Sequence, residues 1–188
     1  MPVSESTQPE IKHAVYEADP DHSTVTFGAR HFGVGSFRGT FSEVSSALTV
    51  DETGPRIEGR AKVESMSIRK PEKFREQMLG ADFFDAAGHP EIEFRSSRLD
   101  LESDGTAVLV GEMIIKGIAK PLQATGTWRG PVEDPYGLQR LALDLDAVVD
   151  RRDWDMSWQA LLPKGGEQAV GWKIRLDARL ELIEKAEE

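Results

Sequence analysis

Three adjacent residues, Asp21, His22 and Ser23, are the residue types of a hydrolase triad. Neighbouring residues of an extended chain point to opposite faces, so these three cannot form a triad with one another. The chain also contains no Gly-x-Ser-x-Gly elbow, no Walker loop and no Gly-x-Gly-x-x-Gly motif. The sequence therefore gives no positive argument for catalysis, and we expect neither catalytic residues nor enzymatic activity.

The residue types that bind metals are sparse. The four histidines are scattered along the chain, at positions 13, 22, 31 and 89, and there is no cysteine. Protein metal sites are typically built from compact spacings such as His-x-x-x-His or from thiolate pairs. We therefore expect no metal and no cofactor, and the lack of cysteine also excludes a disulfide framework.

His31 is a polar residue on an otherwise apolar face that it shares with Phe27. Such a histidine either hydrogen-bonds a backbone carbonyl in the core or anchors the polar head of an amphiphilic ligand. Arg75, and Arg151 or Arg152 further along, are further candidates for such an anchor, although an arginine is more often a solvated or salt-bridged surface group. The residues alone leave both readings open.

The stretch from 21 to 41 must position His31. Every second residue of Val25–His31 is apolar or histidine, and a period of two is typical of a half-buried strand. Gly33 and Gly35 permit a tight reversal, after which the apolar alternation resumes over Phe37–Phe41. We therefore predict an antiparallel hairpin, and Gly39 within its second arm predicts a close approach to the backbone.

The same alternation recurs along most of the chain and predicts an all-β fold. Further strands are expected at residues 14–16, at 48–50 as a continuation of the hairpin, and at 57–66, 92–96, 107–116, 122–128, 141–149 and 170–182. Between them, Pro71 and Gly80 bound a helical period, and a further turn extends this helical insert to about residues 71–86. About eight antiparallel strands suit an up-and-down barrel that can enclose one small ligand, and a sandwich without a cavity is the alternative.

Composition narrows the function classes. The length of 188 residues and the lack of repeats predict a single domain at 14–184, preceded by a mobile polar lead at 1–13. The net charge of −10 argues against nucleic-acid phosphates and against an anionic membrane surface as partners. No apolar run is long enough to span a bilayer, so we expect a protein that is not membrane-embedded. The first residues lack the features of a signal peptide, which predicts a cytoplasmic location.

Four motifs in order along the chain resemble the YceI-like family. They are residues 19–27 with 30–34 and 39–41, Asp82–Asp85 with His89–Ser96, the hairpin Gly111–Pro121, and Asp150–Trp154. Each motif is weak by itself, but four in the right order are specific. The resemblance covers the chain from about Tyr16 to Leu182.

This resemblance implies a lipocalin-like antiparallel barrel with a helical insert and a long apolar cavity that holds a polyisoprenoid or a similar long-chain amphiphile. Members are generally not considered enzymes, and dimers are known in the family, which implies a homodimer. Carried over by position, the residues that face the cavity are Phe27, His31, Phe37, Phe41, Phe83, Phe84 and Phe94, with Arg75 near the mouth. On the helix, Met78 stands where the family often has a polar histidine.

The expected function is the sequestration or transport of one such lipid. Each buried CH₂-sized group contributes ~0.8 kcal/mol, so a long tail can bind tightly with few polar contacts. An interaction or stress-response module whose barrel is filled by its own side chains is the main alternative. An isomerase or hydrolase on the same scaffold is a third.

Overall fold

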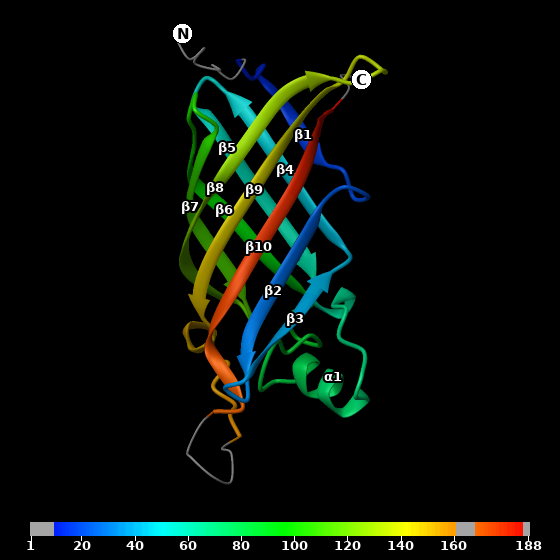
Figure 1. The fold of residues 1–188 in the computed structure, drawn as a ribbon, viewed down its shortest axis with the longest axis vertical. Helices are drawn as coiled ribbons and strands as arrows, with labels where there is room; N and C mark the ends of the chain where they lie inside the picture. The colour runs from blue at the N-terminus through cyan, green and yellow to red at the C-terminus, as the bar shows by residue number, and fades with distance from the viewer. Residues whose placement is uncertain (1–9, 161–167, 186–188) are drawn as a thin grey trace.

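The computed structural model describes residues 10–160 and 168–185, so most of the expected polar lead at 1–13 lies outside the described residues. The strands are β1 Ala14–Ala18, β2 Thr24–His31, β3 Gly35–Phe41, β4 Val44–Asp51, β5 Gly54–Lys62, β6 Glu91–Leu101, β7 Thr106–Ile115, β8 Ile118–Glu133, β9 Gln139–Asp150 and β10 Val170–Glu184. One α-helix, α1 Glu72–Leu79, and two 3-10 turns, Val63–Ser65 and Arg151–Trp154, complete the described elements. Figure 1 shows the strands wrapped around a long axis, with α1 at one end and β1 at the other.

The sheet closes on itself because β1 pairs with both β4 and β10. β1 and β2 lie along the same edge of β10, where Tyr16 is opposite Glu184 and Phe27 is opposite Leu176. They are therefore two halves of one interrupted strand position, and β3 and β4 form another. All pairings are antiparallel, so the ten strands make a closed barrel of eight positions. The predicted barrel is confirmed, and the sandwich is excluded.

The β2–β3 hairpin forms where the sequence predicts it, with His31 opposite Gly35. Gly39 lies opposite Phe27, and a Cβ atom at position 39 would come within 2.5 Å of the Phe27 ring. The glycine therefore lets the aromatic ring pass over the neighbouring strand into the barrel. This contact is the close approach that a glycine within the strand predicted.

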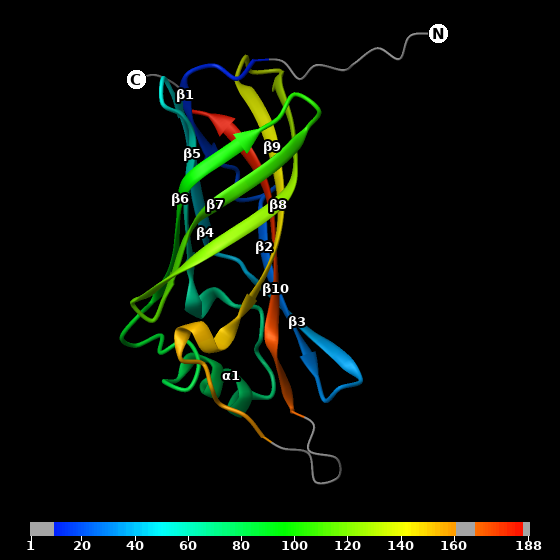
Figure 2. The same cartoon turned by 90° about the vertical axis from the view of Figure 1, so that its left-hand side faces the viewer.

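The segment between β5 and β6 crosses the α1 end of the barrel (Figure 2). β5 ends at Lys62, earlier than the alternation predicted, because the chain turns into the 3-10 turn at Val63. The helix α1 ends where the Gly80 N–H donates back to the carbonyl of Glu76 at 2.9 Å. Residues 81–84 and 86–88 then form turns rather than helix, so the helical part of the 71–86 insert is shorter than expected. Within the described ranges no helix combines the length and the apolar composition needed to cross a bilayer.

Two clusters of buried side chains occupy the barrel. One lies at the β1 end and includes Tyr16, Trp128 and Leu143, which are each at most 4% exposed. There the Trp128 Nε1–H donates to the carbonyl of Glu102 at 2.8 Å, which satisfies the indole. The other cluster lies at the α1 end and is rich in phenylalanine and methionine. The barrel is therefore closed at the β1 end by its own side chains, whereas phenylalanine and methionine side chains predominate at the α1 end.

Candidate functional site

An apolar cavity of about 230 Å³ lies inside the barrel. Its lining starts at the α1 end and includes Leu145 and Leu180 from the cluster at the β1 end. The alternative of a barrel filled by its own side chains therefore describes only the β1 end. The rest of the interior retains space that no side chain of the described residues occupies.

The cavity is long for its volume. On β10 the lining runs from Val170 to Leu180. Ten residues at about 3.3 Å each, on a strand tilted by about 40°, span roughly 25 Å of barrel axis. The cavity is therefore longer than one leaflet of a bilayer core is thick, which is about 15 Å, half of the whole core. This shape suits a single extended chain better than a compact ring system.

The wall at the α1 end is a cluster of phenylalanine rings. The centroid of Phe27 lies 5.1 Å from that of Phe41, 6.1 Å from Phe37 and 6.4 Å from Phe84. Phe37 in turn contacts Phe74 of α1 edge-on at 5.5 Å. Tilted and edge-on pairs at these separations are favourable, so the rings hold one another in place. They also fasten the hairpin to the helix.

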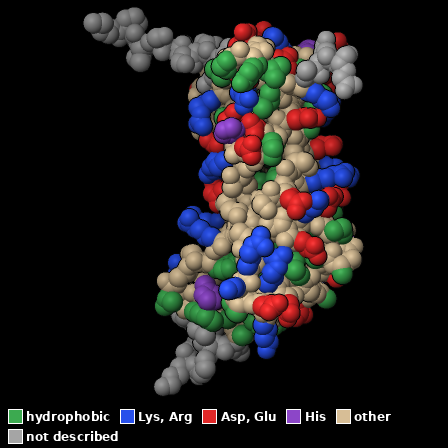
Figure 3. Space-filling model, turned by 90° about the vertical axis from the view of Figure 1, so that its right-hand side faces the viewer, with side chains coloured by type: hydrophobic (Ala, Val, Ile, Leu, Met, Phe, Trp, Pro, Cys, Tyr) green, Lys and Arg blue, Asp and Glu red, His purple; other side chains and the backbone are tan. Residues whose placement is uncertain are grey.

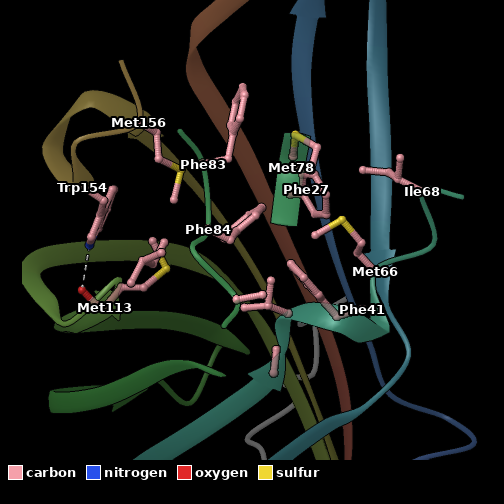
Figure 4. Close-up of a cluster of buried hydrophobic side chains, with 14 residues drawn as sticks. Phe27, Phe41, Met66, Ile68, Met78, Phe83, Phe84, Met113, Trp154 and Met156 are labelled. Atoms are coloured by element: carbon pink, nitrogen blue, oxygen red, sulfur yellow. Dashed lines mark hydrogen bonds between the residues drawn. The ribbon is translucent and has the colours of Figure 1, made fainter. Parts of the chain in front are cut away.

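Methionine side chains complete this wall of the cavity. Figure 4 shows Met66, Met78, Met113 and Met156 arranged around Phe84, and the last three also line the cavity with it. Methionine is unbranched and polarisable, so it adapts to irregular apolar shapes. Met78 replaces the polar residue that the resemblance implied at this position, and it makes the helix face of the cavity apolar.

The structure places the site residues that the sequence predicted as follows. The side chains of Phe27, His31, Phe37, Phe41, Phe83, Phe84 and Phe94 all line the cavity. The cavity is also lined by inward-facing residues of β7 to β10 that were not predicted as site residues, among them Leu109, Ala124, Leu145, Ala147 and Leu176. The alternation in these strands could have identified them, but only once their inner face was known.

Arg75 is not among the residues that line the cavity. Its guanidinium donates to the carbonyls of Glu64 at 2.7 Å, Ile68 at 2.9 Å and Met66 at 3.1 Å. These contacts fasten α1 to the first 3-10 turn and to the segment that follows it. The structure therefore gives Arg75 a positioning task at the end of the barrel.

His31 lies at the α1 end of the cavity, with its ring 3.9 Å from the ring of Phe32. Among the described residues its ring nitrogens have no hydrogen-bond partner, so the structure does not show a core histidine bonded to a carbonyl. No carboxylate in the described ranges orients this ring either, which is what a general base needs. His31 can offer a donor or an acceptor to a polar group that enters the cavity.

Arg151 also lines the cavity and is only 3% exposed. Its guanidinium donates to the carbonyls of Met156, Trp158 at 2.8 Å and Gly171 at 3.2 Å, and it lies 4.3 Å from the ring centroid of Trp172. Burial lowers the pKa of Arg151 from its usual value, but an arginine remains charged at neutral pH.

No carboxylate of the described residues hydrogen-bonds Arg151. The neighbouring Asp150 pairs instead with Arg152 at 2.6 Å, which holds the pKa of Asp150 well below its usual range. Arg151 also donates to the carbonyl of Val170, the residue opposite His31 on β2. The fold therefore brings the two polar groups to the same end of the cavity, although they are far apart in sequence.

A group of potential metal ligands lies elsewhere, at the bend between β1 and β2. Asp19, His22 and Glu181 place their ligand atoms within 4.8 Å of one another. Arg140 already occupies this group, at 3.2 Å from Asp19 and 2.7 Å from Glu181. The guanidinium neutralises the carboxylates. The group therefore joins neighbouring strands through ion pairs and is not a cation site.

Comparisons with known proteins agree with this geometry. The model of the YceI-like domain matches residues 16–182. A UPF0312 protein of Pseudomonas putida is 26% identical over 177 residues, which cover 92% of this chain and 88% of that protein. Protein YceI of Escherichia coli is 24% identical over 147 residues, which cover 76% of each chain.

Solved structures share the fold. BcnA of Burkholderia cenocepacia aligns with a TM-score of 0.69 at 19% identity, covering 87% of this chain and 98% of that one. A polyisoprenoid binding domain from Saccharophagus degradans, implicated in plant cell wall breakdown, aligns with a TM-score of 0.68 at 10% identity, covering 92% of this chain and 100% of that one. At these identities the likeness shows the fold alone.

Proposed function

The chain belongs to the YceI-like family, and from this premise we propose that it binds one long-chain amphiphile, such as a polyisoprenoid, in the cavity of its barrel. The observation that carries the proposal is the long, narrow, apolar cavity that remains inside a closed barrel. The Saccharophagus degradans domain of the same fold, which is a polyisoprenoid binding domain, supports this class of ligand. Binding here is sequestration or transport, without chemical conversion of the ligand.

The ligand has a direction in this proposal. The tail extends from the α1 end towards Leu180, and the polar head stays near His31 and Arg151. An extended apolar chain needs no hydrogen bonds along the wall, so two polar groups at one end are sufficient to orient it. Since Arg151 carries a charge without a hydrogen-bonded carboxylate, a head group with an oxygen acceptor suits this end.

Chain length sets the affinity. Each CH₂-sized group that leaves water contributes about 0.8 kcal/mol, whereas association costs about 4–15 kcal/mol in lost freedom. Five such groups contribute about 4 kcal/mol and barely offset that cost, whereas twenty contribute about 16 kcal/mol. We therefore expect affinity to rise steeply with length until the tail fills the cavity, and to level off beyond that length.

The first test is native mass spectrometry of the purified chain, followed by organic extraction of whatever it carries. A co-purifying long-chain species at one per chain supports the proposal and identifies the ligand class. The chain is then delipidated and titrated with a series of prenols of increasing length, using displacement of a fluorescent fatty probe. Absence of a bound species together with no affinity for any member of the series would overturn the proposal.

We also propose a cytoplasmic location and a homodimer. Both rest on the sequence and on its resemblance to the family. Cell fractionation with immunodetection tests the location, and light scattering on the purified chain at several concentrations tests the dimer. Recovery of the protein only from the periplasmic or the extracellular fraction would contradict the location, and a constant mass near 20.8 kDa would contradict the dimer.

A further inference from the structure

The turn between β2 and β3 presents two apolar side chains to solvent. Phe32 is 42% exposed and Val34 is 92% exposed. The turn is closed by a hydrogen bond from the Val34 N–H to the carbonyl of His31 at 3.3 Å. In Figure 2 the hairpin leaves the body of the barrel beside α1, so its tip projects from the molecule.

The conformation of this turn does not explain the presence of Phe32. Phe32 and Gly33 both have positive φ angles, 51° and 69°, as the central residues of a type I′ turn do. That turn favours Asn-Gly, and a bulky side chain at the first position is strained. A small polar residue would suit both the backbone and the solvent better, so the phenylalanine points to a task outside the fold.

Exposed basic residues lie on both strands of this hairpin and on the segment at the start of α1. The exposed basic residues are Arg30 of β2, Arg38 of β3, Arg69 and Lys70 just before α1, and Lys73 within α1. No ion pair links any of these five to a carboxylate of the described residues, and Arg30 donates only to the carbonyl of Gly33, at 3.1 Å. Figure 3 shows Lys and Arg side chains on the lower part of the face that contains β3, close to hydrophobic side chains at its rim.

These basic residues share one end of the molecule. The Phe37 ring of β3 packs against Phe74 of α1, and the Ser67 N–H donates to the carbonyl of Thr40 at 2.8 Å, so β3 and the helix segment are held together. Two acidic residues, Glu72 and Glu76, lie on the same helix. Over residues 28–41 and 66–80 the six Lys and Arg residues outnumber these two acidic residues, and Asp82 and Asp85 follow just after, whereas the whole chain carries a net charge of −10.

We propose that this end of the barrel docks on an anionic lipid bilayer, with Phe32 and Val34 inserted into the interface and the five basic residues over the lipid phosphates. Aromatic and aliphatic side chains at interfacial depth, surrounded by Lys and Arg, are the combination that holds a peripheral protein on such a surface. The net charge of the chain predicted the opposite, because it averages over faces that never meet the membrane.

Docking in this orientation brings the cavity to the bilayer. His31 immediately precedes Phe32 and lines the α1 end of the cavity. A lipid tail could then pass between bilayer and cavity with little exposure to water. The docking proposal goes beyond ligand binding, since the surface does not depend on what the cavity holds.

Sedimentation with vesicles tests whether the basic residues attract the chain to an anionic bilayer. The whole chain is mixed with phosphatidylcholine vesicles that contain or lack phosphatidylglycerol, and we expect binding only to the former, weakening as salt is raised. Arg38→Glu with Lys70→Glu should reduce binding by at least about thirtyfold, since the loss of each positive charge near the surface contributes about fivefold and the new carboxylates add repulsion. The matched control, Arg98→Glu with Arg129→Glu, makes the same change in net charge in the other half of the barrel and should have much less effect.

A site-specific probe tests the insertion. The chain has no cysteine, so Val34→Cys carries a single environment-sensitive dye, and Tyr136→Cys, which replaces a side chain that is 87% exposed in the β8–β9 turn, serves as control. We expect a blue shift on anionic vesicles for the dye at position 34 alone. Phe32→Ser with Val34→Ser should lower vesicle binding about tenfold or more, because a buried Phe or Val side chain contributes that much.

Two results would overturn the docking proposal. One is equal binding of the chain to both kinds of vesicle, and the other is the same dye response at positions 34 and 136. Prenol binding is measured in solution without vesicles, so a failure of cavity binding and a failure of docking are separate results. Circular dichroism on each variant verifies that the barrel has formed.

Discussion

A substitution that shortens the cavity tests the extended-chain reading most directly. Ala147 of β9 lines the cavity and lies opposite Leu176 of β10. Leu176 is six residues from Val170, where the lining of β10 begins, which corresponds to roughly 15 Å of the cavity's roughly 25 Å. Ala147→Phe therefore places a ring across the cavity at that depth and leaves the α1 end open.

The expected effect depends on ligand length. Prenols that fit within the remaining length should bind Ala147→Phe about as well as the parent chain. For longer prenols, exclusion of only four CH₂-sized groups costs about 3 kcal/mol, which is a loss of about a hundredfold. The introduced ring enters existing space, so we expect no more than about 1 kcal/mol of destabilisation, in contrast to the 1–3 kcal/mol typical of an overfilled core.

The neighbouring position provides the control. Val148 is the next residue on β9, points outward and is 61% exposed. Val148→Phe adds the same ring to the outer surface and should leave the binding of every prenol unchanged. The assay is displacement of a fluorescent fatty probe across the length series, with thermal unfolding measured in parallel. Equal weakening of short and long prenols by Ala147→Phe would refute the reasoning, as would unchanged binding of the longest.

Three further outcomes are expected. His31→Ala should weaken a prenol with a polar head more than a headless alkene of equal length, and equal losses in fluorescence displacement would contradict the anchor role. Gly39→Ala should lower the free energy of unfolding by about 1–3 kcal/mol in a denaturant titration, because the new methyl overlaps the ring that passes over it. The control Gly35→Ala has no neighbouring atom closer than 3.9 Å and should be nearly neutral. Hydrogen bonding to Arg140 lowers the pKa of Asp134, so its contribution to stability is present above about pH 4 and is lost as pH falls through the lowered pKa. Asp134→Asn should make the melting temperature depend less on pH over that acidic range. An unchanged dependence on pH would show that the pair of Asp134 and Arg140 contributes nothing.

The polar end of the cavity has a consequence for specificity. Arg151 is held by carbonyl oxygens and by the ring of Trp172 rather than by a carboxylate. A carboxylate partner would neutralise the guanidinium and weaken its attraction for a head group. With carbonyl partners the side chain stays fixed and keeps its positive charge, because no carboxylate of the described residues neutralises it. Cavity length and this one charge could together select among amphiphiles without any hydrogen bond along the tail.

Local patterns in the sequence determined much of the fold. The alternation over residues 24–41 predicted the β2–β3 hairpin, and Gly39 predicted the close approach that Phe27 makes. Pro71 and Gly80 correctly bounded α1. These features follow from periods of two or 3.6 residues and from the freedom of glycine, which depend only on near neighbours in the chain. The assignment of all seven phenylalanine and histidine positions to a cavity needed a family resemblance, although His31 stood out from the residues alone, since alternation does not say what a face encloses.

Only the tertiary structure decided whether the strands close, and what remains inside them. A sandwich and a barrel have the same alternation, because closure depends on the pairing of β1 with β10 at opposite ends of the chain. Hollowness depends on how the volumes of side chains from eight strand positions add up. For the same reason the sequence could not tell Arg75, which lies outside the cavity lining, from Arg151, which lines the cavity and donates to the carbonyl of Val170, the strand partner of His31. Which charges face a ligand is a property of distant segments brought together, and no local period records it.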